Sequence, residues 1–363
     1  MDLKNIKIKN TLGMFDMTKG VIMILVILAH TYGLFEGISA NSPFMLVALL
    51  LMVLGCAAMP ILFVVSGYGF RKMPFKKCLK KQFEILIIPY IVTALITCIV
   101  HCISYYILYG GKRVSVMETA KVFIAFAFGF SNHMCEGMFA NVACGPIWFL
   151  LAFVIANLMF NQLLHFFEGK KLLLAALLVS CLGWLLGYVV ILPWNINQGL
   201  VATLYVALGY YAEKTRLFTS EIPLKYKLLV LVSLIINIVL ICQNKAYDMS
   251  SNDYGAGIIT IVIEGILSIA LIYLFLLMNS LRGRISNLIR SIGRGSLYVL
   301  CVHTIEMMGA GKYIQYDFAN NWQGSLWLRS LIIFTVRLVL VMGITCAFVR
   351  IKTAIYNKQI IKN

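Results

Sequence analysis

The sequence predicts an all-α polytopic membrane protein with about ten transmembrane helices and with both termini in the cytoplasm. Three observations support this class: 61% of the 363 residues are apolar, only 12% are charged, and the mean hydropathy is +0.90. A soluble domain is typically about 45–50% apolar and about 25% charged. So few charges cannot cover a soluble fold of this size. The composition therefore excludes a soluble enzyme, a disordered chain and a secreted disulfide scaffold.

Ten stretches are apolar enough to be membrane spans, since a helix needs about 20 such residues to cross the hydrocarbon core. In chain order they are 17–36, 44–69, 83–109, 146–167, 172–192, 199–212, 228–243, 257–278, 295–310 and 325–349. Their apolar runs are continuous and lack the period of two that transmembrane barrel strands show. The sequence contains no internal repeat or appended soluble region, so residues 1–363 are predicted to form a single membrane domain.

The basic residues between these stretches support their order and orientation. Twenty-four of the 31 Lys and Arg residues lie on one predicted side of the membrane, at 4–19, 71–81, 170–171, 214–227, 282–294 and 350–362. Five lie on the other side, and the remaining two, Arg329 and Arg337, lie inside the last stretch. Because cytoplasmic loops collect Lys and Arg, this split predicts cytoplasmic termini. The net charge of +17 is thus mainly an orientation signal, and nucleic acid is not an expected partner.

One connecting segment, 110–145, is long. Its semi-apolar part, 122–130, is predicted to lie at the interface or to dip back into the membrane. A disulfide between Cys135 and Cys144 is left open. The ten cysteines show no C-x-x-C or other metal spacing. No metal site is therefore expected, although this segment contains four ligand-type side chains: His133, Cys135, Glu136 and Cys144.

Ionisable groups inside spans are expensive and are often functional. Here they are Lys19, His30, Glu264, His303, Glu306, Arg329 and Arg337. For any one of them alone, an interhelical hydrogen bond or a snorkelling head group is at least as good an explanation.

Lys19 and His30 are more informative as a pair. They are eleven residues apart, which is about 20° past three helical turns, so both side chains share one helix face. Their separation along the axis is about 16 Å. A ligand with phosphates at one end and a reactive group at the other, such as an acyl-coenzyme A, fits this spacing. Histidine is the usual general base for activating a hydroxyl, whereas Lys19 could equally be an orientation signal alone.

Several motifs resemble the acyltransferase 3 family of integral membrane acyltransferases. The first is a basic residue, ten residues and a histidine, here Lys19 and His30, and the flanking Asp16 and Gly20 are similar to the fucose 4-O-acetylase-like branch. Further matches follow in the family order, at 60–68 (PILFVVSGY), 145–150 (GPIWFL), 208–211 (LGYY) and 292–298 (IGRGSLY) with His303. The family usually has arginine at the first position, and lysine is a point charge that lacks the bidentate phosphate contact of arginine.

The resemblance implies a multi-pass enzyme of the bacterial inner membrane that takes an acetyl or short acyl group from cytoplasmic acetyl-CoA or another acyl-CoA. The acceptor would be a hydroxyl of a cell-surface glycan, a glycolipid or another lipid-linked envelope molecule. His30 would be the general base, oriented by Glu264 or Glu306, although Glu306 and His303 could instead satisfy each other. The donor would be held by Lys19, Arg71, Lys72, Ser66 and Tyr68, and the acceptor by Trp148, Trp194, Trp322 and His303.

Other interpretations remain at this stage. Buried Glu264, Glu306, Arg329 and Arg337 would also suit the polar pathway of a secondary transporter, although paired broken helices are not evident. A non-catalytic partner in the export of an envelope polymer is a third interpretation. Ser66 as a nucleophile is disfavoured relative to a packing role, tryptophan belts at membrane interfaces are common, and a homo-oligomer is left open.

Overall fold

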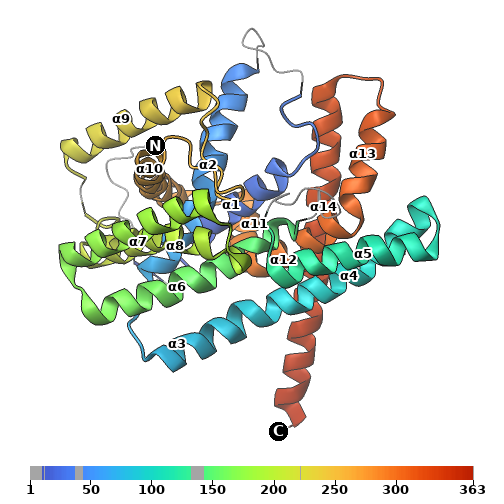
Figure 1. Ribbon diagram of the computed structural model, residues 1–363, viewed down its shortest axis with the longest axis horizontal. Coiled ribbons are helices and arrows are strands. Elements are labelled where there is room, and N and C mark those ends of the chain that lie inside the picture. Colours follow the sequence, from blue (N-terminus) through green and yellow to red (C-terminus); the bar gives the residue numbers. More distant parts are fainter. Residues whose placement is uncertain (1–9, 12, 37–43, 132–142, 221, 363) are drawn as a thin grey trace.

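The computed structural model describes residues 10–11, 13–36, 44–131, 143–220 and 222–362, and all of its regular elements are helices (Figure 1). This agrees with the predicted all-α class. The helices are α1 (Asp16–Ala29), α2 (Met45–Tyr68), α3 (Phe75–Gln82), η2 (Phe83–Ile87), α4 (Ile88–Tyr109), α5 (Lys112–Phe128), η4 (Gly145–Ile147), α6 (Trp148–Phe166), α7 (Gly169–Val189), η5 (Pro193–Asn195), α8 (Ile196–Lys214), α9 (Leu224–Cys242), α10 (Ile258–Leu277), η6 (Met278–Ser280), α11 (Arg284–Arg294), α12 (Ser296–Glu306), η7 (Met307–Gly311), α13 (Lys312–Asn320) and α14 (Leu326–Lys362).

Seven helices of the described chain are long and apolar enough to cross a membrane, so this is a multi-pass membrane protein. They are Met45–Tyr68, Phe75–Tyr109, Gly145–Phe166, Gly169–Val189, Leu224–Cys242, Ile258–Ser280 and Leu326–Lys352. These helices match seven of the ten predicted stretches. The other three, 17–36, 199–212 and 295–310, correspond to α1, α8 and the α12–α13 region. For these three, a membrane crossing stays a prediction, as does the cytoplasmic location of the termini.

The first helix is shorter than its predicted stretch. α1 has 14 residues and is therefore about 21 Å long, less than the roughly 30 Å of the hydrocarbon core. The chain leaves the helix at His30, and Gly33 then adopts a φ of +67° in the following turn. The apolar residues after Ala29 thus belong to a turn that faces other helices.

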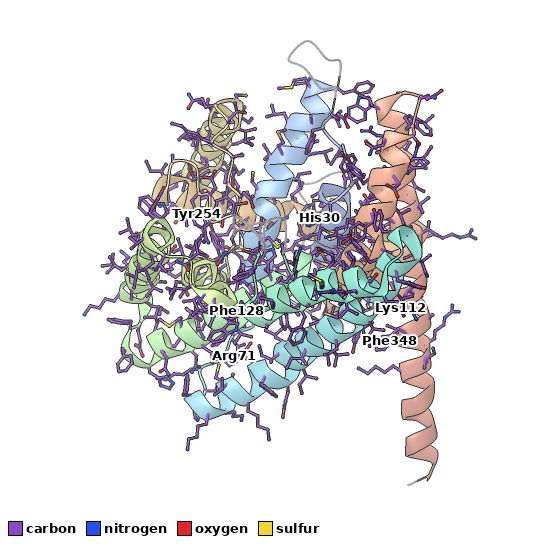
Figure 2. All side chains as sticks on the ribbon, turned by 45° about the vertical axis from the view of Figure 1, so that its right-hand side comes forward. His30, Arg71, Lys112, Phe128, Tyr254 and Phe348 are labelled. Carbon is purple, nitrogen blue, oxygen red and sulfur yellow. The ribbon has the colours of Figure 1, made fainter. Side chains whose placement is uncertain are left out.

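The segment 110–145 begins with a helical hairpin rather than an irregular loop. Gly110 and Gly111, with φ values of +70° and +77°, reverse the chain, and α5 then packs along α4. Figure 2 shows Lys112 and Phe128 at the two ends of α5 beside α4. His133, Cys135 and Glu136 lie outside the described residues, and so the disulfide between Cys135 and Cys144 stays open, while the Cys144 thiol is buried.

Close helix crossings depend on glycine. A Cβ atom at Gly67 of α2 would collide with the main-chain carbonyl oxygen of Val206, and one at Gly209 of α8 would collide with that of Val64. At the crossing of α1 and α11, a Cβ atom at Gly293 would collide with the carbonyl oxygen of Asp16. Small residues allow this approach, which is a main source of helix association in membranes.

Replacing Gly209 with alanine should lower the free energy of unfolding by about 1–3 kcal/mol, because the new methyl group overpacks the α2–α8 crossing. Gly55→Ala in α2 is the matched control, since a Cβ atom there meets nothing within 4 Å. Unfolding in detergent micelles measures both changes. Equal stability of the two variants would contradict the tight crossing.

Candidate active site

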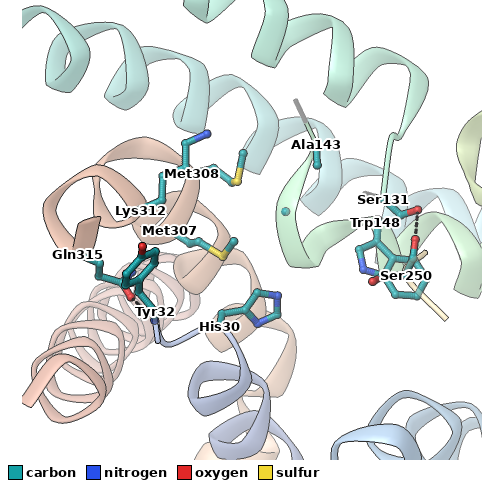
Figure 3. Close-up of a pocket in the computed structure, with 11 residues that line it drawn as sticks. His30, Tyr32, Ser131, Ala143, Trp148, Ser250, Met307, Met308, Lys312 and Gln315 are labelled. Atoms are coloured by element: carbon teal, nitrogen blue, oxygen red, sulfur yellow. Dashed lines mark hydrogen bonds between the residues drawn. The ribbon is translucent and has the colours of Figure 1, made fainter. Parts of the chain in front are cut away.

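One pocket contains two of the residues that the sequence singled out, His30 and Trp148. It has a volume of about 360 Å³, within the range of small-molecule sites, and it lies between the end of α1, the start of α6, the η7–α13 region and two loops. Its lining residues are His30, Tyr32, Ser131, Ala143, Gly145, Trp148, Ser250, Met307, Met308, Lys312 and Gln315 (Figure 3).

His30 reaches into this pocket from the end of α1 (Figure 3). Its Nδ1 lies 2.7 Å from the carbonyl oxygen of Val26, four residues earlier. A carbonyl oxygen only accepts hydrogen bonds, so Nδ1 carries the proton in the neutral ring and Nε2 keeps its lone pair. Because the ring is held through Nδ1, Nε2 is the nitrogen that remains to accept a proton.

Arg337 of α14 fixes the main chain at His30. Its Nη1 donates to the carbonyl oxygen of His30 at 2.5 Å, and its Nε and Nη2 donate to the two oxygens of Glu306 at 2.9–3.2 Å. Nη1 also lies 3.4 Å from Oε1 of Gln315, which accepts the backbone N–H of Tyr32 at 3.1 Å. Arg337 is 3% exposed, so its charge is buried and balanced by Glu306. One guanidinium therefore joins α1, α12, α13 and α14.

His303 lies directly behind His30. The two ring centroids are 5.4 Å apart in an edge-to-face arrangement, and Nδ1 of His303 lies 3.4 Å from Oε2 of Glu306. His303 is fully buried and is not part of the pocket lining. Glu306 thus contacts His303 and Arg337 rather than His30 itself. His303 packs against the ring of His30, and its predicted role at the acceptor stays a prediction.

The π-helical turn η7 (Met307–Gly311) shapes the wall of the pocket between α12 and α13. It follows Glu306 directly, and Met307 and Met308 line the pocket. Single π turns inside α-helices are frequent at functional sites. The sequence stretch 295–310 was predicted as one helix and gave no sign of this turn.

The opposite wall is held by a hydrogen-bonded pair of loops. The Ser131 hydroxyl donates to the carbonyl oxygen of Ser250 at 2.6 Å and accepts from Nε2 of Gln198 at 3.0 Å. Asp248 holds the turn that carries Ser250 by accepting from its backbone N–H at 2.9 Å. Buried Trp148 adds an aromatic surface to this wall, and its role at the acceptor stays a prediction.

Lys19 lies at the opposite end of α1 from His30. Its Nζ is 3.3 Å from Oδ1 of Asp16, and Nη1 of Arg294 is 3.9 Å from the other oxygen of the same carboxylate. The close packing of Gly293 on α1 brings Arg294 to this position. The predicted separation of a basic end and a histidine end along α1 is therefore present, with Arg294 as a second cation.

The other predicted donor residues lie at the end of α2. Arg71 is exposed and lies 3.4 Å from Glu213, and Lys72 is exposed beside it. Tyr68 is buried and packs edge-on against Phe15, with ring centroids 5.1 Å apart. Ser66 donates to Oδ1 of Asn157 at 3.4 Å. None of these four side chains lines the pocket of His30.

Three further predicted residues lie away from the pocket. Glu264 is buried between α9 and α10 and accepts from Nδ2 of Asn237, so the structure does not bring it to His30. Trp194 is 52% exposed and donates to the carbonyl oxygen of Ala127 at 3.0 Å. Trp322 donates to the carbonyl oxygen of Ser325 at 3.0 Å. These three residues do not line the pocket of His30, and their roles stay predictions.

The sequence did not single out several residues of the site. Gln315 and Ser250 lie more than 200 residues from His30 along the chain, and Tyr32, two residues after His30, carries no motif of its own. Arg337 was noted as a buried charge, but its partner could not be identified from the sequence. Within the described ranges, no group of three or more His, Cys, Asp or Glu side chains is placed to hold a metal ion.

A comparison with protein families now identifies the class of enzyme. The family model of the acyltransferase 3 family, described as an acyltransferase domain, matches residues 13–348, nearly the whole chain. The chain belongs to the acyltransferase 3 family. It is therefore a membrane acyltransferase, as the motifs around Lys19 and His30 predicted. No curated protein and no solved structure matches the chain in these comparisons.

Removing one partner of the Arg337–Glu306 pair should destabilise this acyltransferase by about 3–5 kcal/mol, because the other charge is left buried and unpaired. Arg337→Gln and Glu306→Gln are the two single variants. Their double variant, which leaves neither charge, should unfold closer to the wild type than either single variant does.

The measurement is a double-mutant cycle on the free energy of unfolding in detergent. A strongly favourable coupling energy between the two positions is expected. Additive effects would show that the two side chains do not form a buried ion pair.

Proposed function

We propose that this acyltransferase moves an acetyl or other short acyl group from cytoplasmic acyl-CoA to a hydroxyl of an envelope glycan, glycolipid or related lipid-linked acceptor. The proposal also places it in the bacterial inner membrane and in the fucose 4-O-acetylase-like branch. The observation that carries it is the hydrogen bond between Nδ1 of His30 and the carbonyl oxygen of Val26. This bond leaves Nε2 of the ring, which lines the pocket, as the proton acceptor. Acyl transfer to a hydroxyl needs such a base.

The reaction follows from this geometry. Nε2 of His30 accepts the proton of the acceptor hydroxyl while the hydroxyl oxygen attacks the thioester carbonyl carbon. The carbon–sulfur bond then breaks, the ester remains on the acceptor, and the coenzyme A thiolate takes the proton back from Nε2. The Arg337–Glu306 pair supports the base, because it holds the His30 main chain without adding a net charge that would oppose the imidazolium.

The donor is proposed to extend along α1. Lys19 and Arg294 offer two cations at the far end of this helix, and Asp16 between them neutralises only one of the two. Phosphates of coenzyme A would bind there, with Arg71 and Lys72 as further cations at the same predicted face of the membrane. The pantetheine arm would then cover the remaining distance of about 16 Å to His30.

The acceptor is proposed to bind at the opposite wall. Trp148 provides an apolar ring surface there, beside Ser131 and Ser250, while Tyr32 and Gln315 offer further polar groups from the His30 side of the pocket (Figure 3). This combination of one aromatic face with several hydrogen-bonding groups suits a sugar ring. A transporter is less well supported, because Arg337 pairs with Glu306 and Arg329 pairs with Glu36 instead of leaving an open polar path.

His30→Ala should lower the rate of acyl transfer by about 10²–10⁴-fold, since the general base is lost. Isolated membranes incubated with labelled acetyl-CoA measure transfer to endogenous acceptor and release of free acetate. Immunoblotting verifies equal expression. A His30→Ala protein that transfers label at the wild-type rate would contradict the proposal.

Lys19→Ala and Arg294→Ala should mainly raise the KM for the acyl-CoA donor, with a smaller effect on kcat, because the phosphate contacts lie far from the reacting carbonyl. Lys171→Ala is the matched control, since this exposed lysine begins a different helix and also removes one positive charge. A fall in kcat at unchanged donor KM in the Lys19 and Arg294 variants would contradict the donor site.

A further inference from the structure

The segment between α2 and α4 carries more positive side chains than its ion pairs neutralise. Six cations lie within residues 71–81, and all six are exposed: Arg71, Lys72, Lys76, Lys77, Lys80 and Lys81. Arg71 lies 3.4 Å from Glu213, and Lys80 lies 3.8 Å from Glu84. The other four have no ion pair within the described part of the chain. This helical segment therefore presents several uncompensated positive charges.

An apolar stripe runs along α3 to the first residue of η2, and Lys76 and Lys80 lie beside it, because each is about 100° around the helix from Phe75 or Leu79. Phe75, Leu79 and Phe83 are spaced four residues apart and are 44–49% exposed. α3 continues without a break through η2 into α4 as one apolar helix, Phe75–Tyr109. The stripe is thus continuous with a helix surface that faces lipid, and the lysines stand at the end of that surface.

The orientation of α3 is fixed by buried amides of α6. Nδ2 of Asn157 donates to Oε1 of Gln82 at 3.0 Å, at the last residue of α3. Asn161 holds Met73 just before α3, accepting from its backbone N–H at 3.1 Å and donating to its carbonyl oxygen at 3.0 Å. Buried amides are unfavourable unless they are hydrogen-bonded. These contacts therefore hold α3 with Cys78 and Gln82 inward and the lysines and apolar stripe outward.

We propose that α3 is a binding site for anionic phospholipids, with Lys76 and Lys80 at the phosphodiester and an acyl chain along Phe75, Leu79 and Phe83. Lys77 and Lys81 add positive charge on the neighbouring exposed face of the helix. Clusters of four or more cations next to a membrane helix attract anionic lipid. Lysines that serve only to orient the protein in the membrane act by their number in a loop, so they do not require a helix held in a fixed orientation. The apolar stripe beside the lysines favours a lipid over a free phosphate.

Native mass spectrometry tests the site on the full chain, released from mixed micelles with dioleoyl-phosphatidylglycerol or dioleoyl-phosphatidylcholine. The wild type should bind phosphatidylglycerol in preference to phosphatidylcholine. The variant Lys76→Gln/Lys77→Gln/Lys80→Gln/Lys81→Gln should lose at least about tenfold in affinity for phosphatidylglycerol, with little change for phosphatidylcholine. These side chains are exposed, so the variant should keep its thermal stability.

The control variant replaces four exposed lysines elsewhere, Lys170→Gln/Lys171→Gln/Lys225→Gln/Lys227→Gln, and should bind phosphatidylglycerol like the wild type. An equal loss in both variants would reduce the effect to net charge and overturn the proposal. Unchanged binding in the α3 variant would also overturn it. Displacement of the lipid by free coenzyme A would assign the lysines to a soluble phosphate ligand instead.

A third variant tests the fixed orientation. Asn161→Ala removes both contacts to Met73 while keeping every charge of the cluster. It should bind phosphatidylglycerol more weakly than the wild type does. Wild-type binding in a folded Asn161→Ala protein would contradict a preformed helix face.

Discussion

The ion pair between Arg337 and Glu306 is the interaction on which the rest of the site depends. Both side chains are buried, and burying a charge is energetically unfavourable. The opposite charge of the partner offsets this cost, and further acceptors bind the remaining guanidinium N–H groups. One of these acceptors is the main-chain carbonyl oxygen of His30. The end of α1 is therefore placed by a side chain more than 300 residues away, and this contact also sets the position of the His30 ring.

The surrounding helices pack closely and keep this ion pair buried. Glycines at the crossings of α2 with α8 and of α1 with α11 bring main chains close enough to exclude lipid from the interior. The π turn η7 follows Glu306 directly, and its residues Met307 and Met308 line the pocket. Close packing at the glycines thus holds the helices together, while the π turn forms part of the pocket wall.

Much of the architecture could be predicted from the sequence, because membrane helices carry a strong local signal. Seven of the predicted stretches correspond to long apolar helices, and the motif containing Lys19 and His30 led to the correct family. The end of α1 could not be predicted, since it depends on Arg337 and on the turn at Gly33 rather than on the apolar run that continues past Ala29.

The site was predictable only in part, and for the same reason. His30 and Trp148, which the sequence singled out, line one pocket, and Lys19 lies at the other end of α1, while their catalytic and binding roles stay predictions. Glu306 pairs with Arg337, which is 31 positions away in the sequence, and Ser131 bonds to Ser250, which is 119 positions away. No local sequence pattern encodes contacts over such separations. Glu264 is, like Glu306, a carboxylate within an apolar stretch of the sequence, yet it accepts a hydrogen bond from Asn237 in a different part of the bundle.

The central claim is that the helix end at His30, held by Arg337, presents Nε2 to the reacting thioester. A cryo-EM structure of the protein with a non-hydrolysable acyl-CoA analogue tests it most directly. The account predicts the acyl carbonyl in the pocket, within about 3.5 Å of the acceptor hydroxyl position beside Nε2. It also predicts an intact Arg337–Glu306 pair and phosphates near Lys19 and Arg294. An analogue bound with its acyl group in another cavity, away from His30, would contradict it.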